Sequence, residues 1–147
     1  MAVTRDIYSN LNLTQLLDPV VVTADANSGS VDTRGYDSVM LLANIGLSGD
    51  VLSGAVFIEL EVEDSPDNSV WTDAADADLT NSVTGTNTGT FALIDAPAED
   101  ELRYIVGYKG DKRYVRVVVN VTGTHTNGTP MAVSAVQGHA HQAPVNT

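Results

Sequence analysis

The sequence predicts an all-β fold: a single-domain β-sandwich or jelly-roll-like barrel of about eight or nine strands. β-branched residues are abundant, with 20 Val and 15 Thr against 12 Leu in 147 residues, and their stiff side chains pack well on a pleated sheet. Apolar and polar residues alternate in several short segments, which is the period of a strand. Turn-forming residues recur about every ten residues, a spacing typical of sandwiches and barrels.

The first third of the chain is predicted to hold an arm and two strands. Residues 1–18 are interpreted as an N-terminal arm because their apolar residues follow neither the helical nor the strand period. Pro19 precedes a strand at 20–22, and residues 25–29 have the composition of a turn. The continuous apolar run at 38–45 predicts a buried strand.

The segment 56–63 alternates strictly between apolar and acidic residues. This pattern predicts a half-buried strand, in which the acidic side chains form a solvated face. The apolar face would consist of Ile58, Leu60 and Val62, and the acidic face of Glu59, Glu61 and Glu63.

The rest of the chain is predicted to add short strands, loops and a tail. Short strands are expected at 70–72 and 89–95, with a polar loop at 80–90 and one helical turn at 96–100. The last strand is expected at 129–137. The predicted organisation is therefore an arm at 1–18, one β domain at 19–138 and a C-terminal tail at 139–147.

The strongest local prediction is a β-hairpin at 102–121. Gly110 and Asp111 suit a two-residue turn between strands at 102–109 and 112–121. In that register the apolar side chains of both strands share one face, whereas a slip by one residue would mix the faces. A solvated hairpin is the simplest explanation of the basic residues here, but the other face also combines Arg, Tyr and aliphatic side chains, as protein interfaces do. Its candidate interface residues are Arg103, Ile105, Tyr114, Arg116 and Val118.

Composition excludes several classes of function. A net charge of −12 with only seven Lys and Arg residues argues against nucleic acid and against anionic membranes as partners. The chain has no cysteine and no apolar run long enough for a membrane helix. It also lacks a secretory signal core, a nucleophile elbow and a phosphate-binding loop. We therefore predict a protein that is not an enzyme and uses no cofactor.

Metal binding is not predicted either, although two clusters contain residue types that bind metals. Eight acidic residues fall between Glu59 and Asp78 without a Lys or Arg among them. A solvated strand face explains them most simply, while a cation site or a pair of catalytic carboxylates stay as alternatives. His139 and His141 have the spacing of metal ligands on a strand, but a flexible tail explains them better.

Four segments together resemble small β-rich head proteins of tailed bacteriophages. They are VDTRGYDS at 31–38, SPDNSVWT at 65–72, YVRVVVNVTGT at 114–124 and AVQG at 135–138. The chain is similar from about Val31 to Asn146 to capsid decoration proteins, also called cement proteins. The resemblance implies a jelly-roll-like domain, often a homotrimer, on the outside of the capsid, with the major capsid protein as its partner. It also implies a virion protein assembled in the host cytoplasm.

In this interpretation the N-terminal arm widens the contact with the capsid through Ile7, Tyr8, Leu11 and Leu13. The alternative is a carbohydrate- or receptor-binding β-sandwich of a virion spike or fibre, because the segment from Ser65 to Trp71 resembles a motif of some sugar-binding sandwiches. An exposed Trp71 would favour that alternative, since aromatic faces stack on sugars, whereas we expect Trp71 to be buried in the core.

Overall fold

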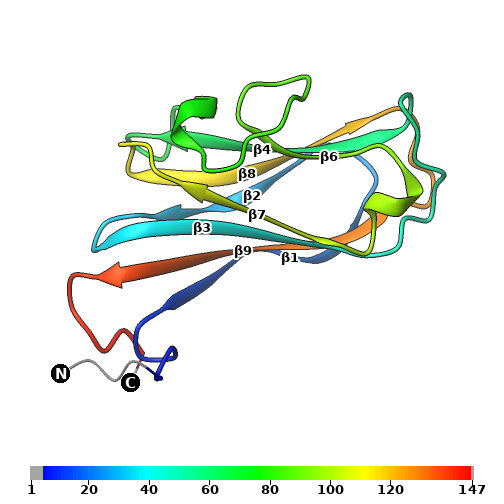
Figure 1. Ribbon diagram of the computed structural model, residues 1–147. Coiled ribbons are helices and arrows are strands. Elements are labelled where there is room, and N and C mark those ends of the chain that lie inside the picture. Colours follow the sequence, from blue (N-terminus) through cyan, green and yellow to red (C-terminus); the bar gives the residue numbers. More distant parts are fainter. Residues whose placement is uncertain (1–4, 147) are drawn as a thin grey trace.

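The computed structural model describes residues 5–146 and is a sandwich of two antiparallel sheets (Figure 1). Sheet I has the strand order β1-β9-β3-β7. Sheet II has the order β2-β8-β4-β5, and β6 also pairs with β4. The strands are β1 (Asn12–Val22), β2 (Ala26–Asp32), β3 (Tyr36–Ile45), β4 (Phe57–Ser65), β5 (Thr72–Asp73), β6 (Thr90–Ile94), β7 (Arg103–Tyr108), β8 (Tyr114–Thr122) and β9 (Thr129–Ala140). Two single-turn 3-10 helices, η1 (Asp76–Asp78) and η2 (Pro97–Glu99), lie in the connections.

The strand pairing follows the pattern of a jelly roll. The first strands of the chain pair with the last ones in reverse order: β1 with β9, β2 with β8, β3 with β7 and β4 with β6. The chain also crosses between the two sheets at most of its connections. The first half of the chain thus runs antiparallel to the second half, and the paired strands are distributed over two sheets, as in double Greek-key jelly rolls. The predicted all-β sandwich or jelly roll of eight or nine strands is confirmed.

The hydrophobic core lies between the sheets. Leu41 and Val133 fill it from sheet I, and Leu60 and Val117 fill it from sheet II, each fully buried. Side chains that face the core alternate with side chains that face outward along each strand, although most outward residues of β4 are buried as well.

Both ends of the sandwich domain extend further than the sequence predicts. Residues 12–18, predicted as part of an arm, belong to β1 and pair with β9. The register of β1 shifts between Gln15 and Leu17 and again between Leu17 and Val20. Such bulges turn side chains to the opposite face, so the apolar residues follow no regular period. At the other end, β9 continues to Ala140, so residues 139–140 belong to the last strand rather than to the tail.

The predicted hairpin at 102–121 is wrong. β7 pairs with β3 in sheet I, whereas β8 pairs with β2 and β4 in sheet II. The apolar faces of the two strands are both in the core, with Val106 in sheet I and Val115 and Val117 in sheet II. They belong to opposite walls of the sandwich instead of lying side by side. A hairpin and a crossing bury the same side chains, so the alternation of residues cannot distinguish them.

The crossing from β7 to β8 is held by a buried carboxylate. Asp64 of β4 accepts hydrogen bonds from the Tyr108 hydroxyl at 2.9 Å and from Lys112 Nζ at 2.7 Å. Burial, together with the bond to Asp64, raises the pKa of Tyr108 well above its usual range. A Cβ at position 110 would overlap the Tyr108 ring and hydroxyl. Gly110 is thus required by close packing against Tyr108 rather than by a hairpin turn.

Lys112→Met is expected to lower the free energy of unfolding by about 2–3 kcal/mol, because it leaves the buried Asp64 carboxylate with one charged donor fewer. The matched control is Lys109→Met, since Lys109 is exposed and its loss should change stability by less than about 0.5 kcal/mol. Urea denaturation of both variants measures the difference. Equal stability of the two variants would contradict the role given to Lys112.

Candidate functional site

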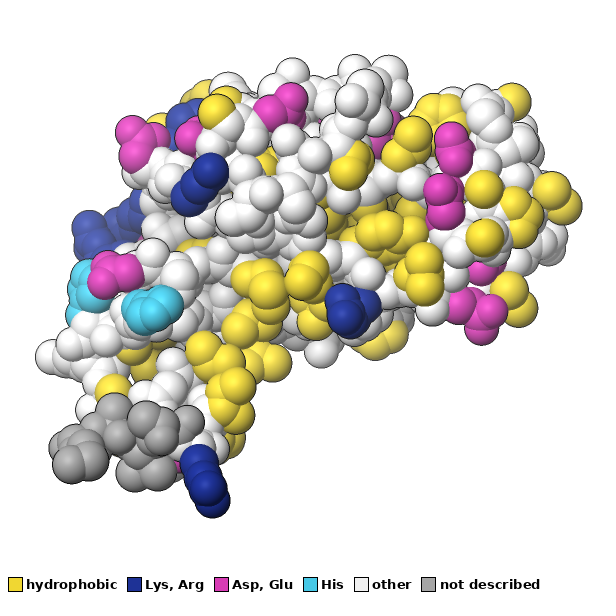
Figure 2. All heavy atoms as spheres, viewed as in Figure 1, with side chains coloured by type: hydrophobic (Ala, Val, Ile, Leu, Met, Phe, Trp, Pro, Cys, Tyr) yellow, Lys and Arg dark blue, Asp and Glu magenta, His cyan; other side chains and the backbone are white. Residues whose placement is uncertain are grey.

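The outer face of sheet I carries an apolar patch that crosses all four strands. Cross-strand partners share a face, and Leu13 of β1 pairs with Val136 of β9, which pairs in turn with Met40 of β3. In the adjacent row, Leu42 of β3 pairs with Ile105 of β7. We call these five residues the sheet I patch. Figure 2 shows hydrophobic side chains gathered in a band over this side of the molecule.

The N-terminal segment extends the patch. Ile7 and Tyr8 are 69% and 67% exposed, and Leu13 is 66% exposed. With Leu11 and Val136 they line an open hollow of about 530 Å³. The segment is tied to the C-terminal residues, because the Asn146 side chain donates to the Tyr8 and Leu11 carbonyls at 2.7 and 2.8 Å, and Val145 N–H donates to the Ser9 carbonyl.

This surface differs in charge from the rest of the chain. The patch and the adjoining hollow contain no acidic side chain, although the chain has a net charge of −12. Arg103, which pairs with Asn44, lies at the β7 edge of the same sheet. An exposed apolar surface with a charged rim is the composition of a protein-binding site.

The structure separates the interface residues that the predicted hairpin had placed together. Arg103 and Ile105 lie in sheet I, whereas Tyr114, Arg116 and Val118 lie in sheet II. Val118 is buried. The arm residues Ile7, Tyr8, Leu11 and Leu13 do lie on the same side of the molecule as Ile105. The sequence does not predict three residues of the patch, Met40, Leu42 and Val136, because their neighbours across the sheet come from distant parts of the chain.

The outer face of sheet II is covered, and its acidic row is not solvated as predicted. Glu59 is only 1% exposed. It accepts hydrogen bonds from Thr86 N–H at 3.1 Å, from Asn87 N–H at 2.9 Å and from the Thr90 hydroxyl. Burial alone would raise the pKa of Glu59, but these donors outweigh it and lower the pKa. Glu59 thus holds the loop before β6 against the sheet, and a Cβ at Gly85 would overlap its carboxylate.

Glu61, the next acidic residue of this row, has a different environment. It is 5% exposed, and its Oε2 atom has no hydrogen-bond partner in the described part of the chain. Burial raises its pKa, and the charges of Asp73 and Glu63 add to the rise, whereas hydrogen bonds from the Asn120 and Asn87 side chains oppose it. One oxygen from each of Glu61, Glu63 and Asp73 lies within 4.8 Å of the others.

Trp71 is half-buried, so it is neither a core residue nor a freely exposed platform. The Arg116 guanidinium lies 4.4 Å from the centre of its ring and covers one face. Arg116 also forms an ion pair of 2.5 Å with Glu63. The ring thus belongs to a cation–π contact within sheet II.

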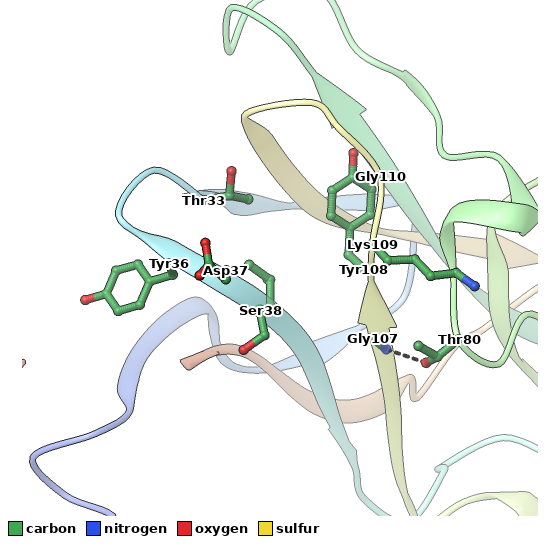
Figure 3. A pocket seen from close by; sticks show the side chains of 10 residues that line it. Thr33, Tyr36, Asp37, Ser38, Thr80, Gly107, Tyr108, Lys109 and Gly110 are labelled. Carbon is green, nitrogen blue, oxygen red and sulfur yellow. Dashed lines mark hydrogen bonds between the residues drawn. The ribbon is translucent and has the colours of Figure 1, made fainter. Parts of the chain in front are cut away.

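A hollow of about 420 Å³ opens between the start of β3 and the end of β7 (Figure 3). Thr80 closes the edge of β7 there, because its hydroxyl accepts from Gly107 N–H at 2.9 Å. Ser38 and Asp37 lie beside it, but each contacts a different histidine: Ser38 pairs with His139 and Asp37 with His141. A catalytic Ser-His-Asp relay needs one histidine that contacts both the serine and the aspartate. Here His139 contacts Ser38 and His141 contacts Asp37, so these residues do not form such a relay.

Comparisons with known proteins found little sequence similarity. No known protein family and no curated protein matches the chain. Among solved structures, a chain titled "Capsid of Ralstonia phage GP4" aligns with 13% identity and a TM-score of 0.39, over 97% of this chain and 92% of that chain. At this identity and TM-score the match assigns no function. Within residues 5–146, no helix has the length and apolar character needed to span a membrane.

The two buried glutamates are expected to respond oppositely to neutralisation. In metal-free buffer at pH 7, Glu59→Gln should lower the free energy of unfolding by about 1–3 kcal/mol, because an amide cannot accept all the hydrogen bonds of the carboxylate. The lowered pKa of Glu59 means that this contribution exists above the unfolded pKa and is lost as pH falls through the folded pKa.

For Glu61 the sign is reversed. Its raised pKa favours the folded state only at low pH, and that contribution is lost as pH rises through the folded pKa. Glu61→Gln should therefore raise the melting temperature at pH 7 in metal-free buffer, with a smaller effect near pH 4. Thermal unfolding followed by circular dichroism at several pH values measures both variants. A loss of stability in Glu61→Gln at pH 7 would contradict this assignment.

Proposed function

We propose that the protein is a structural virion protein that binds the outside of a phage capsid as a decoration protein. Its capsid-binding surface is the sheet I patch together with the N-terminal segment around Ile7 and Tyr8. The observation that carries the proposal is the uncharged, exposed apolar face in a strongly acidic chain. The choice of a capsid as partner comes from the sequence resemblance between Val31 and Asn146.

The distribution of charge supports this role. An apolar surface on one side provides the area that a partner buries, at roughly 25 cal/mol for each Å² removed from water. The acidic remainder of the surface faces solvent and keeps a densely decorated particle soluble. Because many copies bind one shell, a modest affinity for each copy is sufficient.

The partners in this proposal are the major capsid protein and further copies of the chain in a homotrimer. The protein acts on the capsid exterior after assembly in the host cytoplasm. It needs no cofactor and performs no catalysis. Neither nucleic acid nor a membrane is a partner, since the negative charge would repel both phosphate backbones and anionic lipids.

Leu13→Glu is expected to weaken binding to assembled capsids by about tenfold or more, because it places a charge within the apolar contact, where the sheet I patch meets the hollow at Ile7 and Tyr8. Val51→Glu is the matched control, since Val51 is 82% exposed in the connection between β3 and β4 and lies outside the patch. Co-sedimentation of each purified variant with undecorated expanded capsids measures the affinity.

Two results would overturn this function. The first is no saturable binding of the wild type to capsids at micromolar concentration. The second is specific binding to a glycan array in place of capsids, which would support the sugar-binding alternative. Equal weakening by Leu13→Glu and Val51→Glu would leave capsid binding in place but refute the sheet I patch as its surface.

The oligomeric state is tested separately. Sedimentation equilibrium of the wild type should give about three times the chain mass of 15.5 kDa. Leu13→Glu should remain trimeric if the patch contacts the capsid and not another copy of the chain. A monomeric Leu13→Glu protein would show that the patch is the trimer contact instead.

A further inference from the structure

Three carboxylates from two different strands lie close together on the outer face of sheet II. Glu63 of β4 lies directly opposite Asp73 of β5 in the strand register. Glu61 is two residues away on the same face of β4, and one oxygen of each residue lies within 4.8 Å of the others. Like charges directly opposite on antiparallel strands destabilise a sheet. This cluster thus requires compensation by a positive group.

The second observation is the environment of Glu61. The residue is 5% exposed, and its Oε2 atom has no hydrogen-bond donor within residues 5–146. Glu59, two residues earlier in the same row, is equally buried but accepts from two backbone N–H groups and a hydroxyl. Buried carboxylates are costly unless they are paired, hydrogen-bonded or bound to a metal. Of the two glutamates, Glu61 is the one with an oxygen that lacks a donor, and one of its oxygens lies within 4.8 Å of carboxylate oxygens of Glu63 and Asp73.

The negative charge of the cluster exceeds the positive charge beside it by the charge of one divalent cation. Three carboxylates carry three negative charges, and Arg116 neutralises one of them through Glu63 Oε2 at 2.5 and 2.7 Å. Both contacts use the same oxygen, so Glu63 Oε1 is left for another ligand. The remaining charge of two is matched by one divalent ion. The donors are all oxygens, which hard cations prefer.

We propose that Glu61, Glu63 and Asp73 bind a divalent cation of the calcium class. Calcium accepts irregular sets of oxygen ligands that include water, whereas magnesium demands a near-octahedral set. Asp73 is exposed, so the ion reaches the site from solvent. The ion joins β5 to β4 and thereby stabilises the connection that covers sheet II. This site lies in sheet II, so the proposal does not depend on the proposed capsid binding through sheet I.

Trp71 supplies a direct probe of the site. It is the only tryptophan of the chain, and it lies two residues before Asp73 with its ring against Arg116. Terbium replaces calcium in oxygen sites, and its luminescence is excited through a nearby indole. Titration of terbium into the wild-type protein under selective tryptophan excitation should give saturable emission that added calcium suppresses. We expect a calcium dissociation constant of about 0.1–1 mM.

Glu61→Gln is the decisive variant because it removes the buried charge at nearly constant volume. It should weaken terbium and calcium binding by about tenfold or more. Asp111→Asn removes the same charge at an exposed position in the connection between β7 and β8. This control should bind terbium and calcium as the wild type does. Calcium at about 100 times the wild-type dissociation constant should raise the wild-type melting temperature by roughly 5 °C or more, and should raise that of Glu61→Gln by about half as much or less.

The capsid-binding variant Leu13→Glu should bind terbium normally, which separates the two proposals. Absence of saturable emission and of a calcium-dependent melting temperature in the wild type would overturn the site. Equal binding by the wild type and Glu61→Gln would overturn it as well, since the ion would then lie elsewhere. A melting temperature that rises with acid but not with calcium would show that a proton, not a metal ion, compensates Glu61.

Discussion

The burial of the two inner sheet faces against each other is the constraint on which the rest of this structure depends. A sheet with one apolar face is stable only when that face is covered, and in this chain each sheet covers the other. Because β7 and β8 are successive strands in opposite sheets, their connection must cross the edge of the core. The Asp64 carboxylate provides polar partners there, joining Tyr108 of sheet I and Lys112 of the connection to sheet II.

The same constraint leaves two outer faces that the chain treats differently. Sheet II is covered by the loop before β6, which Glu59 holds through its hydrogen bonds. Sheet I has no such cover over Leu13, Met40 and Ile105 within the described residues. A covered outer face on sheet II and an exposed apolar face on sheet I are what we expect of a protein that binds its partner through one face only. It also separates the proposed capsid contact from the proposed cation site by the full thickness of the sandwich.

Local pattern was sufficient to predict the fold class and the inward side of most strands. Ile58 and Leu60 are fully buried, as the alternation at 56–63 predicts. Pairing was not predictable from the same information, because both a hairpin and a crossing bury Val106 and Val115. The decisive contact, Tyr108 with Asp64, joins residues 44 positions apart, and no short-range spacing reveals it.

The candidate sites depend on pairing even more than the fold does. The sheet I patch exists because Leu13, Val136 and Met40 are neighbours across three strands, although they are far apart in the sequence. The acidic face at 56–63 was predicted to be solvated, since an isolated strand exposes its polar side. A loop more than 20 residues further along the chain buries it, and β5 then sets Asp73 against Glu63. A solvated carboxylate needs no protein partner, whereas a buried carboxylate with an unsatisfied oxygen is costly unless a positive group compensates it. This is why Glu61, with its Oε2 atom unpartnered within residues 5–146, indicates a site that the sequence pattern alone does not reveal.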